Sequence, residues 1–466
     1  MIAAVIVTAN SALRRSVVWV GLAVFVGLLA SAGETAAGWK AGLAKIEITP
    51  ETPMRMSGYA SRDHAAEGKE TDLWAKSVLL EDEKGHRALA ISLDLVGIDG
   101  KTSKLLKERI GKDLGLQPGE ISLLCSHTHC GPIVGHNLLS MYALTEEEHA
   151  QIRTYTAGLV DRIVKVASMA AADLKPADIS YGSGTASFAV NRRTNKEPEV
   201  PAQREKFALL GPSDHAVPVL RIVTDGKLRG VVFGYACHAT TLSYYQWCGD
   251  YPGFAMMEIE AAHLGAVALF WAGCGADQNP LPRRTVELAK SYGHQLAAAT
   301  EGVLQSAMKP IAGELSVQYD EIPLGFAHIP GREELESLKK SPNRYEAARA
   351  TYLLSILEKE GKLATEYPYP IQTWKLGGGP QWVMLGGEVV VDYSLRVKKE
   401  NAGEPVWVAG YANDVMAYIP SVRVLKEGGY EGRDSMVYYG HPSAWNEEVE
   451  ERIIKGVTRL LSAGRP

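Results

Sequence analysis

The sequence predicts an α/β fold in which a central mixed sheet is flanked by helices. Three observations support this prediction. Short apolar runs alternate with segments of helical spacing along most of the chain. Several of these runs end in polar side chains, and α/β proteins bind ligands beyond the carboxyl ends of their strands. The 466 residues are 46% hydrophobic, which is ample for a large buried core.

The first segment has the pattern of a secretory signal peptide. Arg14 and Arg15 precede the apolar run 16–30, and small residues follow at 30–32. An uncleaved membrane anchor is the alternative, but the run is short for a bilayer span. We therefore expect a signal peptide over 1–32 and an exported protein, either periplasmic or secreted.

The next part of the chain alternates strands and helices. An apolar strand is expected at 87–98, followed by a helix at 101–115 that ends in a glycine. A second strand follows at 120–126. A long helix is expected over about 145–174, because its first turn is acidic and its apolar residues have helical spacing.

The alternation continues toward the C-terminus. The runs 228–237 and 266–274 are apolar enough for buried strands, and each precedes a helical segment. Residues 333–362 predict a charged helical insertion. Residues 381–399 and 406–421 are then expected to return to strand and loop.

Polar side chains that suit a metal follow several of these predicted strands. His127 and His129 follow the strand at 120–126, and His238 follows the run at 228–237. Other segment ends carry Asp277, Asn279, Glu388 and Tyr418. A catalytic zinc takes imidazole and carboxylate ligands and keeps one position open. The sequence therefore predicts a metal site at the carboxyl ends of the strands.

The spacing of His127 and His129 leaves their individual roles open. Alternate side chains of an extended segment point to opposite faces, so both bind one ion only if the backbone bends. Either both are ligands, or one is a ligand and the other lies beside the metal or carries a proton. A lone histidine is usually a hydrogen-bonded core or loop residue. The pair, together with His238 and Glu388, favours a site.

Four of the five cysteines lie close to these motifs. They are either soft metal ligands or small buried apolar groups. Their spacing matches no common zinc pattern, which favours buried apolar groups.

Seven segments, taken in order, resemble the neutral/alkaline non-lysosomal ceramidase family. They are "AKIEITP…MSGYASR", "SHTHCGP", "GYACHATTLS", "CGDYPGFA", "GADQNP", "LGGEVVV" and "GYANDVMAYIP…GGYEG". The similarity extends from about Gly38 to Tyr439 and rests on the order of the whole set. It implies a ceramidase-like catalytic domain over 38–466.

The resemblance implies a zinc amidase that cleaves the N-acyl bond of ceramide and releases a fatty acid and sphingosine. Carried over residue by residue, the ligands of one Zn²⁺ per chain fall on His127, His238, Glu388 and Tyr418. His129 falls on the histidine that the family has next to the metal, Arg192 on the arginine of its Asn-Arg motif, and Tyr430 on a tyrosine that borders the substrate.

Two departures from the family pattern concern the substrate. Asn279 stands where the family has a serine. Asparagine cannot accept an acyl group, but its amide can donate a hydrogen bond to an oxyanion. The family also carries a C-terminal β-sandwich domain, which we do not expect here because the chain ends in one predicted helix at 444–464.

Together these patterns predict an exported zinc-dependent amidohydrolase that uses a metal-activated water on a ceramide-like N-acyl lipid. The expected catalytic residues are His129, Asn279, Tyr430 and Arg192. The alternatives are a zinc hydrolase of another small amide or ester, and a metal-stabilised binding protein without catalysis. A lipid substrate implies transient contact with a membrane surface, whereas the net charge of −5 gives no reason to expect nucleic acid.

Two further points stay open from the sequence. The carboxylates Asp94, Asp250 and Asp277 either orient the histidines or cap backbone N–H groups. The insertion carries an apolar stripe at Tyr345, Ala348, Tyr352, Leu353 and Ile356. That stripe either packs on the core or forms a lid that admits an acyl chain.

Overall fold

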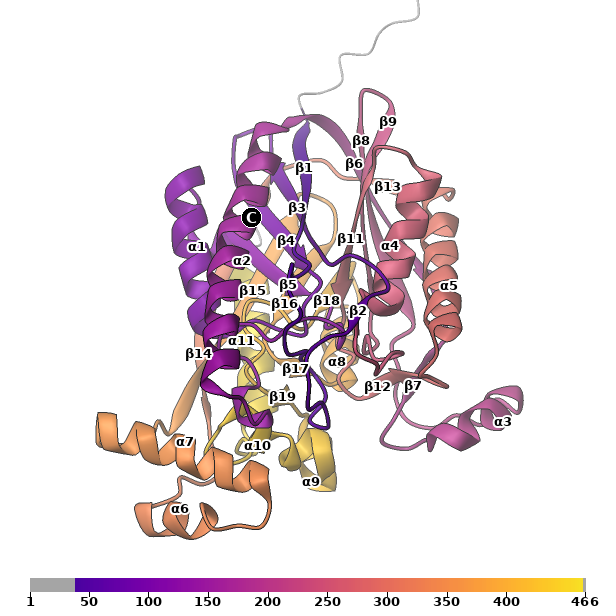
Figure 1. Cartoon of the computed structure of the whole chain (residues 1–466). Helices are drawn as coiled ribbons and strands as arrows, with labels where there is room; N and C mark the ends of the chain where they lie inside the picture. Colours follow the sequence, from indigo (N-terminus) through magenta and orange to yellow (C-terminus); the bar gives the residue numbers. More distant parts are fainter. Residues whose placement is uncertain (1–37, 464–466) are drawn as a thin grey trace, which may run out of the picture. The chain divides into compact units, whose positions relative to one another are not determined.

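Two β-sheets that pack face to face form the centre of the fold (Figure 1). The computed structural model describes residues 38–463, so the signal peptide predicted over 1–32 lies outside the described residues. Helices cover the outer face of each sheet. This arrangement confirms the predicted α/β class with a large mixed sheet, and it adds a second sheet that the sequence did not separate from the first.

The larger sheet mixes parallel and antiparallel neighbours. Its strands lie in the order β11-β9-β8-β6-β1-β3-β4-β5, and β13 pairs with β6. Their bounds are β1 (Trp39–Glu47), β3 (Trp74–Glu81), β4 (Arg87–Leu93), β5 (Ile121–Cys125), β6 (Lys175–Thr185), β8 (Ala216–Thr224), β9 (Lys227–Tyr235), β11 (Val267–Ala272) and β13 (Lys309–Pro310). Only the pairs β4–β5 and β9–β11 are parallel. The four segments expected as strands up to residue 274 therefore form those two parallel pairs.

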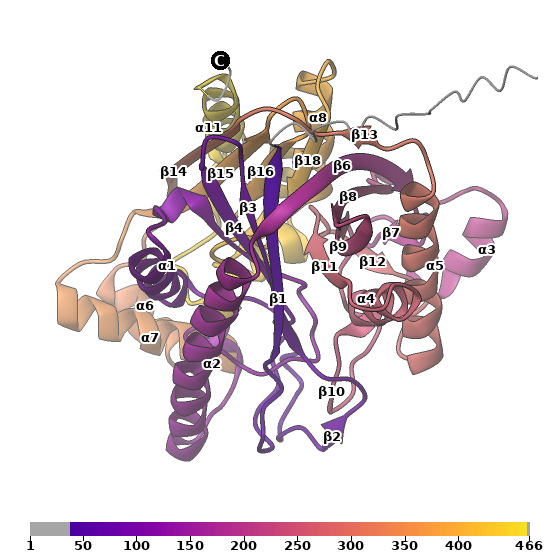
Figure 2. The same ribbon diagram turned by 90° about the horizontal axis from the view of Figure 1, so that it is seen from above.

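The larger sheet bends so that its two ends approach each other (Figure 2). β11 at one end contacts β3, β4 and β5 at the other end. The Ser92 hydroxyl of β4 donates a hydrogen bond of 2.7 Å to the Phe270 carbonyl of β11. The bend brings the loops after β5, β9 and β11 together, and these loops carry the predicted site residues.

The second sheet has four strands in the order β14-β15-β16-β18. Their bounds are β14 (Leu315–Gly325), β15 (Glu366–Leu376), β16 (Gln381–Leu385) and β18 (Val406–Ala409). The interface with the larger sheet is rich in tryptophan. The ring of Trp271 in β11 lies 4.7 Å from that of Trp382 and 5.0 Å from that of Trp407. Burial of these large rings contributes strongly to the packing between the two sheets.

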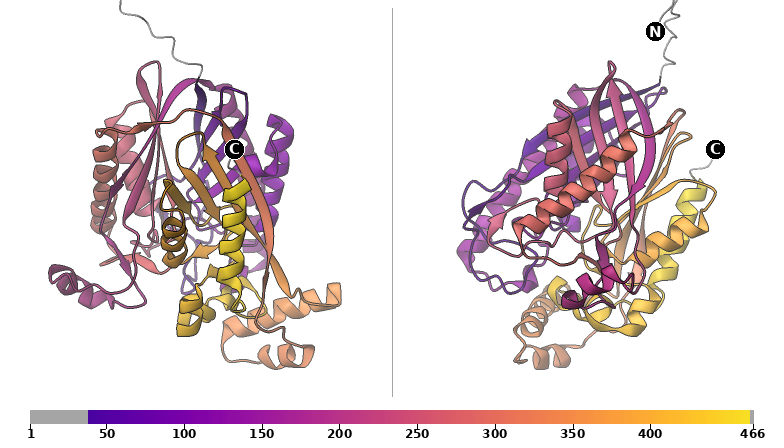
Figure 3. Two further views of the ribbon diagram at one scale, coloured as in Figure 1. Left: turned by 180° about the vertical axis from the view of Figure 1, so that it is seen from behind. Right: turned by 90° about the vertical axis from the view of Figure 1, so that its right-hand side faces the viewer.

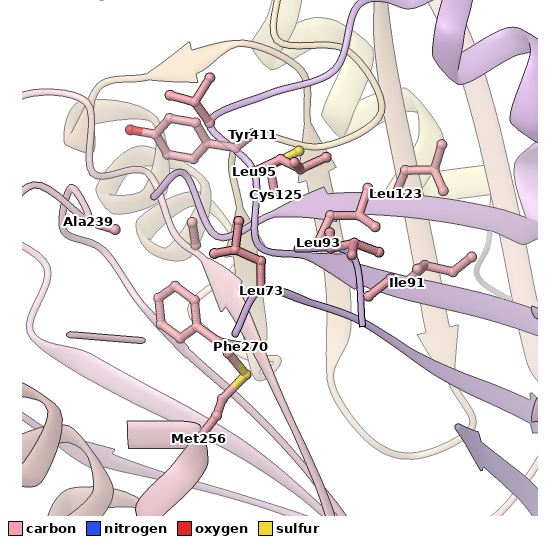
Figure 4. Close-up of a cluster of buried hydrophobic side chains, with 14 of the residues drawn as sticks. Leu73, Ile91, Leu93, Leu95, Leu123, Cys125, Ala239, Met256, Phe270 and Tyr411 are labelled. Carbon is pink, nitrogen blue, oxygen red and sulfur yellow. The ribbon is translucent and has the colours of Figure 1, made fainter. Parts of the chain in front are cut away.

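Helices cover the outer faces of both sheets (Figure 3). Those on the larger sheet are α1 (Gly100–Leu114), α2 (Glu146–Ala172), α4 (Asp250–Ala262) and α5 (Val286–Leu304); those on the second sheet are α8 (Val391–Glu400) and α11 (Val449–Ala463). Figure 4 shows part of the larger core, where Phe270 of β11 meets Met256 of α4. Across residues 38–463, no helix combines the length and apolar character needed to cross a membrane.

The helix expected over 145–174 is confirmed, and its ends follow its sequence. Thr145 is the N-cap, and its hydroxyl accepts the Glu148 N–H while the Glu148 carboxylate accepts the Thr145 N–H. This reciprocal capping box satisfies two of the amide donors that a helix start leaves free. The acidic first turn also complements the helix dipole.

The prediction of strand and loop over 381–399 is wrong for residues 391–399, because Val391–Glu400 forms α8. Its β-branched start suggested a strand. The buried positions, however, include Val391, Ser394 and Val397, which are three residues apart and lie on one helical face. Packing of that face against β18 and α11 decides the structure.

The residues predicted as a helical insertion contain α6 (Arg332–Leu338) and α7 (Arg344–Glu360). The two helices pack on each other at the lower left of Figure 1 through a small cluster that includes Leu335, Ala350 and Leu353. Within the apolar stripe, Leu353 is buried, Tyr345 and Ile356 are half-buried, and Ala348 and Tyr352 are exposed. Besides α6, α7 contacts α10 (Met436–Tyr439) and the turn at 139–141.

Short elements complete the fold and carry much of the site. The two-stranded sheets are β10 (Gln246–Trp247) with β2 (Gly68–Lys69), β12 (Gln278–Pro280) with β7 (Ala189–Asn191), and β17 (Glu388–Val389) with β19 (Tyr418–Ile419). The short helices are α3 (Val200–Glu205), α9 (Val422–Glu427) and α10 (Met436–Tyr439).

Candidate metal centre and active site

A backbone bend after β5 brings the two histidines of the His-Thr-His segment together. His127 has φ of 61°, in the left-handed region that ordinary residues rarely adopt. The bend places the Nε2 atoms of His127 and His129 only 3.1 Å apart. The backbone therefore bends in the way that would let both histidines bind one ion. It lies at a strained residue, as is common in functional sites.

Two of the predicted ligands, Glu388 and Tyr418, come from the small parallel sheet of β17 and β19. The two residues lie directly opposite each other in its register, and both are buried, with 3% of their surface exposed. Each stands at the first position of its strand. One pair of short strands thus delivers a carboxylate and a phenol to the same point.

Four predicted ligand atoms meet in one buried cluster. Glu388 Oε2 lies 3.1 Å from His127 Nε2 and 3.1 Å from His238 Nε2. The Tyr418 hydroxyl lies 3.3 Å from His238 Nε2. His129 adds a third imidazole, because its metal-binding nitrogen lies within 4.8 Å of those of His127 and His238.

The hydrogen bonds of the histidines show that these atoms face each other as acceptors. His127 Nδ1 donates to the Val96 carbonyl at 2.5 Å, and His238 Nδ1 donates to the Gly275 carbonyl at 2.8 Å. A neutral imidazole that donates from Nδ1 presents a lone pair at Nε2. Glu388 Oε2 therefore meets two lone pairs, and within the described chain it has no hydrogen-bond partner.

The protonation states suit a cation between these groups. Burial, and then the charge of Arg192, lower the pKa of His238 to about 4. At neutral pH His238 is therefore a neutral imidazole, which is the state in which a histidine binds a metal.

The donor set fits zinc. Two ligand atoms held about 2.0–2.2 Å from one tetrahedral ion lie roughly 3.3–3.6 Å apart, close to the contacts found here. Nitrogen and oxygen donors of this kind suit catalytic zinc. The five cysteines are buried and unpaired, and burial raises the pKa of Cys125 and of Cys248 to about 12. They behave as buried apolar groups, as their spacing favoured.

Arg192 orients the side chain of Asn279. β7 pairs with β12, which places Asn279 opposite Val190, two residues before Arg192. Arg192 Nη1 donates to Asn279 Oδ1 at 3.2 Å, and the Thr240 hydroxyl donates to the same oxygen at 3.4 Å. A guanidinium has no acceptor, so the amide oxygen must face it. The Nδ2 donor of Asn279 is left for a ligand.

A buried ion pair holds Arg192 in place. Arg192 Nε donates to Glu431 Oε1 at 2.7 Å, and Arg193 Nη1 donates to Glu431 Oε2 at 2.5 Å. Arg192 Nη2 also donates to the Tyr418 hydroxyl at 3.1 Å. Tyr430 lies at the outer edge with 41% of its surface exposed, and its ring centroid is 5.2 Å from that of Tyr418. All eight residues predicted for the site therefore lie in one connected group.

The three aspartates act as caps, because no hydrogen bond or ion pair joins them to the histidines among the described residues. Asp94 accepts the Trp74 N–H, Asp250 accepts the N–H groups of Leu242 and Tyr251, and Asp277 accepts the Val391 N–H and the Asn191 amide. Backbone carbonyls, rather than carboxylates, orient His127 and His238.

The sequence did not identify the residues that support His129. A Cβ at Gly58, whose φ is 98°, would lie 2.4 Å from His129 Nδ1. Arg62 is buried, and its Nη1 donates to the carbonyls of Ser57 and His129 at 2.6 and 2.5 Å. Gly58 and Arg62 both belong to the segment "MSGYASR", and they contact His129 of the segment "SHTHCGP". The first segment was therefore the sequence signal that could have identified these supporting residues.

Tyr439, which the sequence did not identify either, supports a predicted metal ligand. Its hydroxyl donates a hydrogen bond to Glu388 Oε1. We expect Tyr439→Phe to weaken zinc binding about 10–100-fold, as loss of a hydrogen-bond partner of a ligand does. Competition with a chelator of known affinity measures the change. Tyr438→Phe is the matched control, and an equal loss in both variants would contradict this role.

Comparisons with known proteins find sequence matches to neutral ceramidases. The family described as neutral/alkaline non-lysosomal ceramidase, N-terminal, matches residues 39–271. Neutral ceramidases of Drosophila melanogaster and Drosophila pseudoobscura pseudoobscura are 24% and 22% identical over 329 residues. These alignments cover 66% of this chain and 42% of each relative, so the chain spans less than half of their length.

Solved structures share the fold. The crystal structure of neutral ceramidase from Pseudomonas aeruginosa superposes with a TM-score of 0.68 at 21% identity, over 89% of this chain and 72% of that one. A ceramidase complexed with C2 gives the same TM-score and identity, over 89% and 73%. The family match covers half of the sequence and includes the segments that carry His127, His129, Arg192 and His238. The chain therefore belongs to the neutral/alkaline non-lysosomal ceramidase family.

Proposed function

We propose that the protein is a zinc-dependent amidohydrolase that cleaves the N-acyl bond of a ceramide-like lipid. One observation carries the proposal: the carboxylate oxygen of Glu388, without a hydrogen-bond partner among the described residues, faces the Nε2 atoms of His127 and His238. We assign one zinc per chain to His127, His238, Glu388 and Tyr418. When bound, zinc supplies Lewis-acid chemistry and lowers the pKa of a water molecule to near neutral.

The chain's own residues would orient the substrate and move protons. Asn279 Nδ2 would donate a hydrogen bond to the carbonyl oxygen of the amide as negative charge develops there. Arg192 keeps that donor turned toward the substrate, because it holds the amide oxygen. His129, beside His127, would pass a proton to the departing amine. Water and the amide thus yield a carboxylic acid and an amine.

The position of Tyr430 supports a substrate that approaches from one side. Tyr430 is half exposed, whereas Tyr418 beside it is buried. The guanidinium carbon of Arg192 lies 5.8 Å from the Tyr418 ring centroid and 5.7 Å from that of Tyr430. We propose that the aromatic edge at Tyr430 contacts the substrate where it enters, and that the N-acyl lipid reaches the site through transient contact with a membrane surface. The signal-peptide pattern supports action outside the cytoplasm.

A substrate panel tests the proposal. The panel contains an N-acylsphingosine, an N-acyl amino sugar and a short polar amide, each measured with and without a chelator. We expect fatty-acid release from the N-acylsphingosine, loss of that release in chelator, and recovery when zinc is added. Turnover of the polar amide alone would contradict the lipid assignment. Turnover that chelation does not affect would contradict the zinc assignment.

A further inference from the structure

Two apolar side chains project from the loop that connects β7 to β8. Phe207 has 97% of its surface exposed, and Leu210 has 61%. Both follow α3, which stands out from the body of the molecule at the lower right of Figure 1. Single exposed apolar residues are common on protein surfaces. The contacts that hold these two side chains outward therefore decide whether they have a role.

The backbone turns the Phe207 ring into solvent in an unfavourable conformation. Phe207 follows the C-cap residue of α3, and its φ of 53° lies in the left-handed region. Its N–H donates to the Arg204 carbonyl at 3.1 Å, and the N–H of Ala208 donates to the Gln203 carbonyl at 2.8 Å. Helices that end in this way usually have a glycine here, because a Cβ is sterically unfavourable. The position thus presents a large ring where its backbone favours glycine.

The rest of the loop is fixed to the strands that carry the active site. The buried side chain of Asn195 accepts the Leu210 N–H at 2.9 Å and donates to the Leu210 carbonyl at 2.7 Å. Leu209 points the other way and packs against the buried cluster that contains Val190. Val190 lies opposite Asn279 in the pairing of β7 with β12. The two exposed side chains therefore have a fixed position relative to Asn279.

The base of this loop is also joined to the segment that carries Tyr430. Arg193 donates to Glu427 Oε2 at 3.0 Å, to the Gly428 carbonyl at 3.0 Å and to Glu431 Oε2 at 2.5 Å. Tyr430 lies between these partners in the sequence and is 41% exposed. The loop and Tyr430 therefore form one continuous edge of the active site.

We propose that Phe207 and Leu210 insert into the surface of a lipid bilayer and hold the active site against it. The inference rests on the proposed hydrolysis of an N-acyl lipid, and it names the surface from which the lipid is taken. A stable protein interface buries about 800 Å² on each partner, far more than two side chains on a projecting tip offer. A bilayer needs no complementary pocket, because its interface accepts single aromatic and aliphatic side chains.

The charges near the tip select neither sign of lipid headgroup. Glu205 and Lys206 directly precede the exposed ring. Behind them, Glu197 pairs with Arg283 at 3.3 Å and with Arg284 at 3.4 Å. Because acids and bases are mixed here, insertion should depend on apolar contact. Binding should then persist at high salt, which screens ionic attraction between exposed charges.

Cosedimentation of the purified protein with phosphatidylcholine vesicles tests the proposal, with no substrate in the vesicles. We expect the wild type to bind them at low and at high salt. Phe207→Gly should bind about 10-fold more weakly, because it removes the apolar ring. Leu264→Gly is the matched control. Leu264 is 91% exposed, but it precedes β11 and so lies at the opposite end of that strand from the site. This variant should bind as the wild type does.

The melting temperature separates insertion from a structural role. Phe207→Gly should melt close to the wild type, because relief of the backbone strain offsets the greater freedom of the unfolded chain. Leu210→Asp leaves the backbone contacts of the tip in place and should also weaken binding. Weaker binding by both variants without a matching loss of stability supports the proposal.

Three results would overturn it. They are no binding of the wild type to phosphatidylcholine vesicles, binding that requires anionic lipid and disappears at high salt, and equal binding by Phe207→Gly, Leu210→Asp and the Leu264→Gly control. None of these measurements depends on turnover, so a failure of the proposed hydrolysis would appear separately in the substrate panel.

Discussion

Glu388→Ala is expected to remove the bound zinc and to lower kcat/KM by well over 100-fold. Its Oε2 atom contacts both His127 and His238, and Oε1 accepts the hydroxyl of Tyr439. Loss of a hydrogen-bond partner of a metal ligand costs about 10–100-fold, so loss of a ligand should cost more. Elemental analysis gives the zinc content, and hydrolysis of the best N-acyl substrate gives kcat/KM.

A matched control distinguishes this effect from general destabilisation. Glu260 also pairs with two buried or half-buried groups, Lys45 and Lys76, but it lies on α4 and is not part of the cluster. Glu260→Ala should lower the melting temperature and leave the zinc content unchanged. Glu388→Ala with wild-type zinc and wild-type activity would show that the ligand assignment is wrong.

Asn279→Ala is expected to lower kcat about 100-fold, as loss of an oxyanion donor does. Asn279→Asp gives the sharper comparison. The aspartate can still accept from Arg192 and Thr240, so the fold should be retained, but it has no Nδ2 donor. Both variants should therefore lose a similar factor in kcat, measured on the same substrate. An Asn279→Asp variant with wild-type kcat would contradict the donor role.

The coupling between Asn279 and Arg192 can be measured as well. If Arg192 acts mainly by turning the amide of Asn279, then Arg192→Met should add little to the loss already caused by Asn279→Ala. Arg192 also donates a hydrogen bond to Tyr418, so the double variant should lose somewhat more kcat than Asn279→Ala alone.

Asparagine cannot accept an acyl group, so pre-steady-state kinetics should show no burst of product.

The sequence predicted the elements with a strong local pattern. The helix over 145–174 was visible from its acidic start and apolar spacing, and the strands before His127, His238 and Asp277 from their apolar runs. The family resemblance is confirmed by the match over 39–271. The separation of the second sheet was not visible, because strand pairing between distant segments leaves no periodic signal.

His127, His129, His238, Asn279, Glu388 and Tyr418 were noticed because they follow apolar runs, whereas Arg192 and Tyr430 were assigned from the family resemblance. The residues that hold these side chains in place were not predicted. Val96 and Gly275 orient the imidazoles through backbone carbonyls, which any residue type provides. Tyr439 lies 51 residues from Glu388, so no local spacing relates them. The sequence shows carboxylates but does not show which backbone carbonyls lie near a side chain. The aspartates were therefore considered as partners of the histidines, a role that backbone carbonyls have in the structure.

The zinc content of the purified wild-type protein tests the central claim most directly. Elemental mass spectrometry of the protein, after dialysis against metal-free buffer, should give about one zinc per chain, because four nitrogen and oxygen donors bind zinc tightly. His238→Ala, prepared in parallel, should fall far below that value. An active wild-type preparation without stoichiometric metal, whose activity persists in chelator, would contradict the account.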